Sequence, residues 1–82
     1  MELNSHPQPV EITVNNKRVV LPSASMTGLA IKEAAVAQGV EIQVSFKLYA
    51  VKGHEQIPVA NDEPVKAHEH EQFRAVAPDD NS

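Results

Sequence analysis

The chain has 82 residues, a net charge of −4 and no cysteine. It therefore has room for one small domain and lacks a disulfide framework, thiolate metal ligands and thiol nucleophiles. The seven lysines and arginines form no basic run, which argues against nucleic acid as a partner. No segment approaches the length of a membrane span, and the polar N-terminal residues do not resemble a signal peptide, so we expect a cytoplasmic protein without a membrane partner.

A β-hairpin is the first element predicted. Residues 1–9 are polar and contain two prolines, and we expect them to form a disordered leader. Residues 10–14, VEITV, alternate apolar and polar side chains with the period of a half-buried strand. Asn15 and Asn16 tolerate the positive φ angles of a two-residue turn, so residues 17–21 are expected to return as the second strand.

A helix is predicted next, because the spacing of the apolar residues changes from two to three and four. The stripe expected to face the core comprises Ile31, Ala34, Ala35 and Gln38. Lys32 and Glu33 are expected to point away from it. Thr27 is the expected N-cap, with Ser25 as the alternative, and Gly39 supplies the left-handed residue that ends many helices.

Two strands and two shorter extended pieces are predicted after the helix. The first strand covers residues 44–51 and ends at Gly53; the side chains expected on one of its faces are Val44, Phe46, Leu48 and Ala50. Pro58 weakens the first short piece, QIPV, and the second is VKAH. The last strand covers residues 72–77, in which the alternating residues are Phe73, Ala75 and Ala77.

The order of these elements predicts the fold class. A hairpin followed by a crossover helix places the third strand parallel to one already laid down. The simplest closed arrangement is an α+β protein with the β-grasp fold, in which one helix packs across one face of a mixed four- to five-stranded sheet. We expect this domain over residues 10–77, followed by a flexible tail over residues 78–82.

The polar residues offer little for catalysis or metal binding. His68 and His70 would face the same way in an extended segment and could chelate a transition metal, but two ligands without a third favour a solvated corner. Helix capping explains the hydroxyl side chains before the helix. With three glycines in the chain, a phosphate-binding loop is difficult to build. We therefore predict that the protein is not an enzyme and uses no cofactor or metal.

A docking patch is predicted on the face of the sheet opposite the helix. An exposed apolar cluster rimmed by charge is typical of protein-binding surfaces, although isolated exposed apolar residues are ordinary. The residues expected in this patch are Lys47, Tyr49, Val51, Arg74 and Val76.

Four segments resemble the bacterial multiubiquitin domain, a ubiquitin-like β-grasp family. They are ITVNNKRV, TGLAIKEAAVAQGV, NDEPV and EQFRAVAPDDNS. The ending F-x-A-V-A-P-D-D-N-S is the most specific stretch, followed by T-G-x-x-I-K-x-A-A. The resemblance extends from about Val10 to Ser82.

This resemblance implies a bacterial ubiquitin-like modifier. A ubiquitin-activating-like enzyme would adenylate its C-terminal carboxylate with ATP, a conjugating-like enzyme would carry it, and a target protein would receive it. A processing peptidase is the remaining expected partner. Members of the family tend to be encoded beside proteins that resemble these enzymes, and such gene clusters suggest antiphage defence. The residues implied as the conjugation and processing tail are Pro78, Asp79, Asp80, Asn81 and Ser82. Pro78 lacks a backbone donor and is expected to free the tail from the sheet.

The tail departs from the Gly-Gly ending of eukaryotic ubiquitin and of the sulfur carriers of cofactor synthesis. No glycine follows Gly53, which disfavours a thiocarboxylate sulfur carrier. We expect the reacting terminus near Asp80–Asn81, and an electropositive crevice in the enzyme that receives it. A second copy could be joined to Lys17, Lys32, Lys47, Lys52 or Lys66. The rival interpretation is an interaction module that binds through the predicted patch and is never conjugated.

Overall fold

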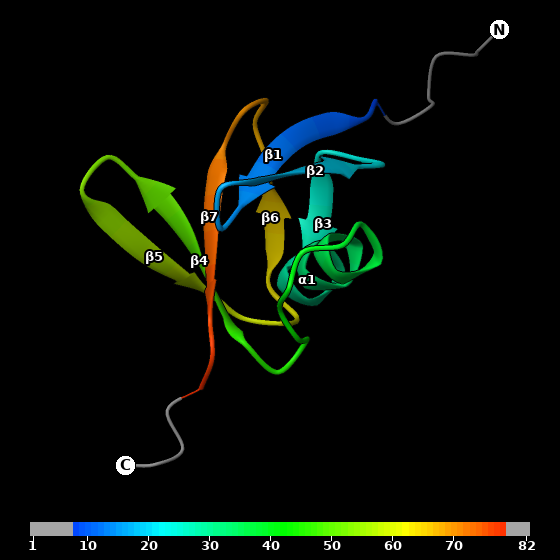
Figure 1. Ribbon diagram of the computed structural model, residues 1–82. Coiled ribbons are helices and arrows are strands. Elements are labelled where there is room, and N and C mark those ends of the chain that lie inside the picture. The colour runs from blue at the N-terminus through cyan, green and yellow to red at the C-terminus, as the bar shows by residue number, and fades with distance from the viewer. Residues whose placement is uncertain (1–7, 79–82) are drawn as a thin grey trace, which may run out of the picture.

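One helix crosses one face of a five-stranded mixed sheet (Figure 1). The computed structural model describes residues 8–78. Its elements are β1 (Val10–Val14), β2 (Lys17–Leu21), β3 (Ser25–Thr27), α1 (Gly28–Ala37), β4 (Lys47–Lys52), β5 (Glu55–Val59), β6 (Pro64–Lys66) and β7 (Gln72–Val76). The large sheet has the order β2-β1-β7-β4-β5, and β3 and β6 form a separate pair. This arrangement confirms the predicted α+β class and β-grasp fold.

The first and last strands form the parallel pair of the large sheet. β1 and β7 run parallel, whereas the other neighbouring strands are antiparallel. β4 follows the helix and runs in the same direction as β2, but the two are not neighbours, because β1 and β7 lie between them. The last strand, β7, therefore lies in the middle of the sheet, between β1 and β4.

The β1–β2 hairpin forms as its sequence predicts. Asn15 and Asn16 have φ angles of 53° and 67°, the left-handed values that a tight two-residue turn requires. Alternate residues of β1 point into the core, where they meet those of β2 and α1. The largest fully buried side chains of the domain are Ile12, Val14, Val19, Leu21, Ile31 and Leu48.

The helix begins and ends where expected, but two of its side chains lie elsewhere. The Thr27 hydroxyl accepts a hydrogen bond from the backbone N–H of Ala30 at 3.2 Å, and Gly39 has a φ of 95°. The prediction that Lys32 points away is wrong: it is 3% exposed, because its ammonium is bound by the backbone carbonyl of Phe46 in the segment that covers it. Gln38, predicted on the buried stripe, is exposed and binds the backbone of Val20 through its side-chain amide.

The strand after the helix is shorter than predicted. Val44 and Ser45 form a turn, which the backbone N–H of Phe46 closes by donating to Gln43 at 2.9 Å. This turn brings the chain from the helix to the sheet, so β4 begins only at Lys47. The prediction that Val44 shares a strand face with Leu48 and Ala50 is therefore wrong, and its side chain is 44% exposed. At the far end, Ala77 lies beyond β7 and is exposed rather than inward-facing.

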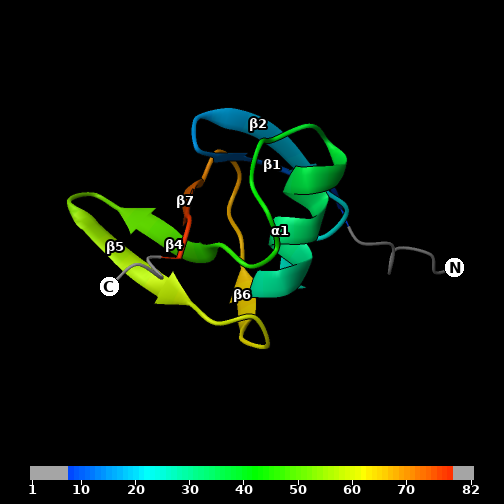
Figure 2. The ribbon, with the colours of Figure 1, turned by 60° about the horizontal axis from the view of Figure 1, so that its bottom comes forward.

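The β4–β5 hairpin reaches beyond the part of the sheet that α1 covers, as Figure 2 shows. Ile57 lies opposite Ala50 on the helix-facing side, yet it is 44% exposed. Pro58 is accommodated because β5 is an edge strand, where a missing backbone donor costs no ladder hydrogen bond. Of the two predicted short pieces, QIPV forms most of β5 and VKAH overlaps β6.

The ends of the chain fall largely outside the described residues. The expected leader is described only at Gln8 and Pro9, and the expected tail only at Pro78; all three are exposed and outside the strands. Within residues 8–78, no helix is long and apolar enough to cross a bilayer.

Candidate functional site

The structure brings together the five residues of the predicted patch. β4 and β7 are antiparallel neighbours, and Lys47 lies opposite Val76 while Tyr49 lies opposite Arg74. These side chains alternate with the buried Leu48, Ala50, Phe73 and Ala75, so they occupy the face of the sheet opposite α1. Tyr49 and Val51 are half-buried and the other three are exposed. Their binding of a partner stays a prediction.

Two residues next to the patch are not predicted from the sequence. Pro58 of β5 lies opposite Tyr49, and Gln56 lies opposite Val51, so both extend the same face. The sequence pattern indicates Pro58 only as a residue that weakens a strand. The two-residue turn at Gly53 could have revealed the pairing, because it fixes the register of the β4–β5 hairpin.

The far side of the same face carries an ion pair. Arg18 of β2 and Glu11 of β1 lie 3.1 Å apart between Nε and Oε2, and the Arg18 side chain is 73% exposed. An ion pair this exposed contributes little to stability. The basic side chains of the patch, Lys47 and Arg74, have no ion-pair partner within residues 8–78.

The end of β7 is the second part of the candidate site. Its pairing with β4 extends to Val76, opposite Lys47. On the other side, the backbone N–H groups of Thr13 and Asn15 donate to the carbonyls of Glu71 and Phe73, each at 3.0 Å. The Asn15 side chain then continues this series at Ala75. Beyond these contacts, Ala77 and Pro78 extend past the sheet as exposed residues.

A shallow hollow of about 370 Å³ lies beside the end of β7. It is lined by Asn15, Asn16, Arg74, Ala75, Val76 and Ala77. Because Arg74 and Val76 belong to both, the hollow and the predicted patch form one continuous surface around the point where the tail begins.

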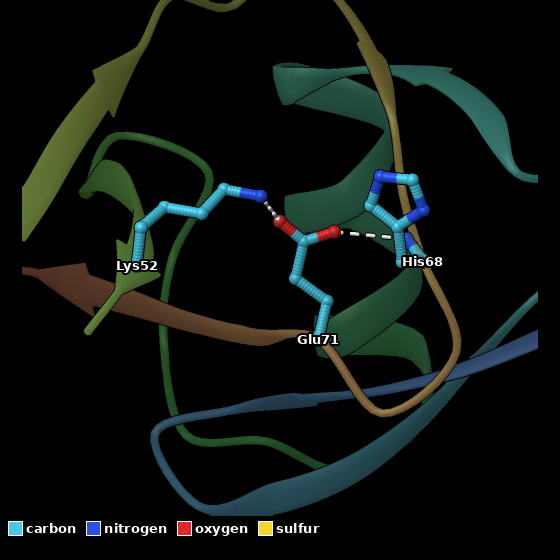
Figure 3. A network of polar contacts seen from close by, with 3 residues as sticks. All are labelled: Lys52, His68 and Glu71. Carbon is cyan, nitrogen blue, oxygen red and sulfur yellow. Dashed lines mark hydrogen bonds and ion pairs between the residues drawn. The ribbon is translucent and has the colours of Figure 1, made fainter.

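A buried carboxylate holds the turn that leads into β7 (Figure 3). Glu71 accepts a hydrogen bond from the backbone N–H of His68 at 2.8 Å, and its other oxygen lies 2.6 Å from the Lys52 ammonium. The Glu71 side chain is 6% exposed, whereas that of Lys52 is 47% exposed. His70 occupies the left-handed region, with a φ of 67°. In the described part of the chain, no three His, Cys, Asp or Glu residues are grouped so that they could hold a metal ion.

Lys32 lies at the wall of an open groove beside the start of β4, the end of β5 and the turn that follows β5. The groove measures about 710 Å³ and is also lined by Phe46, Lys47 and Tyr49. The Lys32 ammonium donates to the Phe46 carbonyl at 2.6 Å, and burial lowers the pKa of this lysine from its ordinary value of 10.5. As an acceptor for a second copy, Lys32 is therefore far less accessible than the exposed Lys17, Lys47, Lys52 and Lys66.

These features define a ubiquitin-like β-grasp domain in which Ala77 and Pro78 continue from the central strand beyond the sheet. A sequence profile of the Multiubiquitin family matches residues 10–79, and the chain belongs to this family. The match confirms the predicted resemblance over the whole domain. No curated protein and no solved structure matches the chain.

Proposed function

We propose that the chain is a bacterial ubiquitin-like modifier that is conjugated through its C-terminus in the cytoplasm. A ubiquitin-activating-like enzyme joins the terminal carboxylate to the α-phosphate of ATP and releases pyrophosphate. A carrier thiol of the conjugating-like enzyme then displaces AMP, and a lysine amine of the target displaces the thiol to form an isopeptide bond. A processing peptidase sets the reacting terminus, near Asp80–Asn81. The modifier contributes the carboxylate and a recognition surface, and its enzymes contribute the catalytic groups.

The observation that carries this proposal is the way in which β7 ends. The last cross-strand pair joins Val76 to Lys47, and Ala77 and Pro78 continue beyond the sheet with exposed side chains. Pro78 has no backbone donor, so it cannot extend the ladder with a further N–H. An enzyme that takes hold of the chain at Ala77 and Pro78 therefore does not have to open the sheet. Membership of the Multiubiquitin family supports the same interpretation.

The predicted patch serves as the recognition surface in this proposal. It lies on the strand that carries the tail, and Val76 is two residues from Pro78. An enzyme that binds the patch is therefore positioned to receive the tail. Lys47 and Arg74 favour an acidic complementary surface, and Tyr49 supplies an aromatic side chain of the kind that dominates binding energy at interfaces.

Intact-mass measurement tests the proposal. The purified chain is incubated with ATP and the ubiquitin-activating-like enzyme of its own gene cluster, followed by the conjugating-like enzyme. We expect an ATP-dependent adduct with the full chain and with a control lacking residues 1–7, and none with a chain lacking residues 78–82. Failure of the full chain to form any adduct with active enzymes would contradict the proposal.

The second candidate function is an interaction module that is never conjugated. The half-buried Tyr49 and Val51 on the open face favour it, because a binding surface there does not require the tail. This alternative predicts that a partner binds equally well after residues 78–82 are deleted, and that no covalent adduct forms. Tight binding that depends on the tail would exclude it.

A further inference from the structure

Asn15 makes a contact that its role in the turn does not require. Its side-chain nitrogen Nδ2 donates to the carbonyl of Ala75 at 3.0 Å, and its Oδ1 accepts from the N–H of Ala75 at 2.9 Å. A primary amide offers a donor and an acceptor as a peptide group does. The side chain therefore acts as one additional rung between β1 and β7, joining residues 60 positions apart in the chain.

This rung is formed where the backbone of β1 can no longer form one. β1 ends at Val14 and the chain turns back at Asn15 and Asn16. Ala75 is held by this side chain on one side and lies opposite Leu48 of β4 on the other. Val76 lies opposite Lys47 of β4, so Ala75 is the last residue of β7 that the β1–β2 hairpin holds.

The turn itself needs only residues that tolerate positive φ. Asn16 has the more positive φ of the two, 67°, and within residues 8–78 its side chain makes no hydrogen bond. Glycine would satisfy the same backbone requirement at either position. What glycine would lack at position 15 is the amide that holds Ala75, so the side chain of Asn15 acts on β7 as well as on the turn.

We propose that Asn15 is a positioning residue for the tail: by clamping Ala75 to the hairpin tip, it sets the point and direction in which the C-terminal segment leaves the domain. Arg74 and Val76 of the predicted patch flank Ala75, so the same contact fixes the tail relative to the patch. An enzyme that binds both gains from a fixed geometry, because binding one presents the other at a high effective concentration. This role of the clamp rests on the proposed function.

Two glycine variants separate the clamp from the turn. Asn15→Gly removes the amide, whereas Asn16→Gly makes the same change of residue in the same turn and leaves the amide in place. Hydrogen exchange of backbone amides, followed by NMR, reports on the Ala75 N–H directly. We expect its exchange to accelerate about tenfold in Asn15→Gly relative to Asn16→Gly, as for the loss of one or two hydrogen bonds. Equal exchange at Ala75 in the two variants would overturn the clamp.

The consequence for the tail is measured by ATP–pyrophosphate exchange with the activating-like enzyme. At a temperature at which both variants are fully folded, we expect Asn15→Gly to raise the KM for the modifier several-fold relative to Asn16→Gly, with kcat unchanged, because the clamp positions the tail and does not react. Asn15→Asp, which keeps an acceptor but loses the donor, should lie between them. When both glycine variants also carry Tyr49→Ala, the difference between their KM values should become smaller. The clamp can position the tail relative to the patch only while the enzyme binds the patch.

The possible results distinguish the two proposals. If the wild-type chain supports exchange and the two glycine variants share one KM, the positioning role is overturned and the modifier function stands. If the wild-type chain supports no exchange with an active enzyme, the modifier function fails and the positioning role fails with it. The hydrogen-exchange result would then still decide whether Asn15 clamps Ala75.

Discussion

The loss of stability expected for Gly28→Ala can be worked out from the contacts of this residue. Gly28 is the first residue of α1 and lies against the turn that follows β5. Its N–H donates to the carbonyl of Glu63 at 3.2 Å, and that of Leu29 donates to Asn61 at 3.0 Å. A Cβ atom added at Gly28 would lie 2.4 Å from the Ala60 carbonyl oxygen, closer than real Cβ atoms approach. Gly28→Ala must therefore push the helix and this turn apart.

The expected cost combines three contributions. Overpacking of this kind costs about 1–3 kcal/mol, and weakening the two backbone hydrogen bonds adds about 1 kcal/mol each. The higher helix propensity of alanine returns about 1 kcal/mol. We expect a net loss of about 3 kcal/mol, a large share of the roughly 4–12 kcal/mol typical of a domain of this length. The melting temperature should fall by about 12–24 °C.

Urea and thermal unfolding followed by circular dichroism measure this loss. Gly53→Asn is the matched control: Gly53 has a φ of 61° and open space around its Cβ position, and asparagine tolerates this conformation. We expect the control to change the free energy of unfolding by less than about 1 kcal/mol. If Gly28→Ala were as stable as the control, the close packing of the helix N-terminus against the β5–β6 turn would be refuted.

Three further substitutions test other parts of the structure. Tyr49→Ala should weaken binding to the activating-like enzyme about tenfold or more while the chain stays folded. Val20→Ala, on the same face but outside the patch, should leave this binding unchanged. An unfolded Tyr49→Ala variant would place Tyr49 in the core, and equal binding by both variants would exclude the patch. Burial lowers the folded-state pKa of Lys32, so the unfolded chain binds more protons between that pKa and 10.5. The free energy of unfolding should therefore rise with pH across this window in the wild type relative to Lys32→Met, and parallel pH profiles of the two in urea titrations would contradict the burial. Glu71→Gln keeps an acceptor for the His68 N–H but loses the ion pair, so it should lower the free energy of unfolding by about 1 kcal/mol. Glu71→Ala loses both interactions and should lower it by about 2–3 kcal/mol. Equal urea midpoints for the two variants would exclude the hydrogen bond as a contributor to stability.

The parts of the fold that depend on neighbouring residues could be predicted from the sequence. The alternation in β1, the paired asparagines and the Thr27 cap act over a few residues, and each is found where its pattern indicates. The side chains of β4 and β7 also alternate, so the membership of the patch followed from parity alone. The fold class followed from the order of the elements and the family resemblance, whereas the order of the strands in the sheet was not predicted.

Contacts between distant segments could not be predicted in this way. The burial of Lys32 depends on the carbonyl of Phe46, which becomes available because a turn delays the start of β4. The clamp between Asn15 and Ala75 requires the parallel pairing of the first and last strands. In the sequence, Asn15 has the pattern of a turn residue and nothing more, because a side-chain amide gives no periodic signal.

The most direct test of the account is the chemical form of the C-terminus in cells that contain the proposed activating-like, conjugating-like and processing enzymes. Arg74 is the last lysine or arginine in the chain, so trypsin leaves every conjugated target lysine with a branch that begins at Ala75. Mass spectrometry of denatured, digested conjugates therefore reads both the acceptor lysine and the residue at which the tail reacted. We predict branched peptides that carry Ala75 through a residue near Asp80–Asn81, and that disappear when the activating-like enzyme is inactivated. Recovery of this segment solely as a linear peptide with a free carboxylate, while the enzymes are active, would contradict the modifier function.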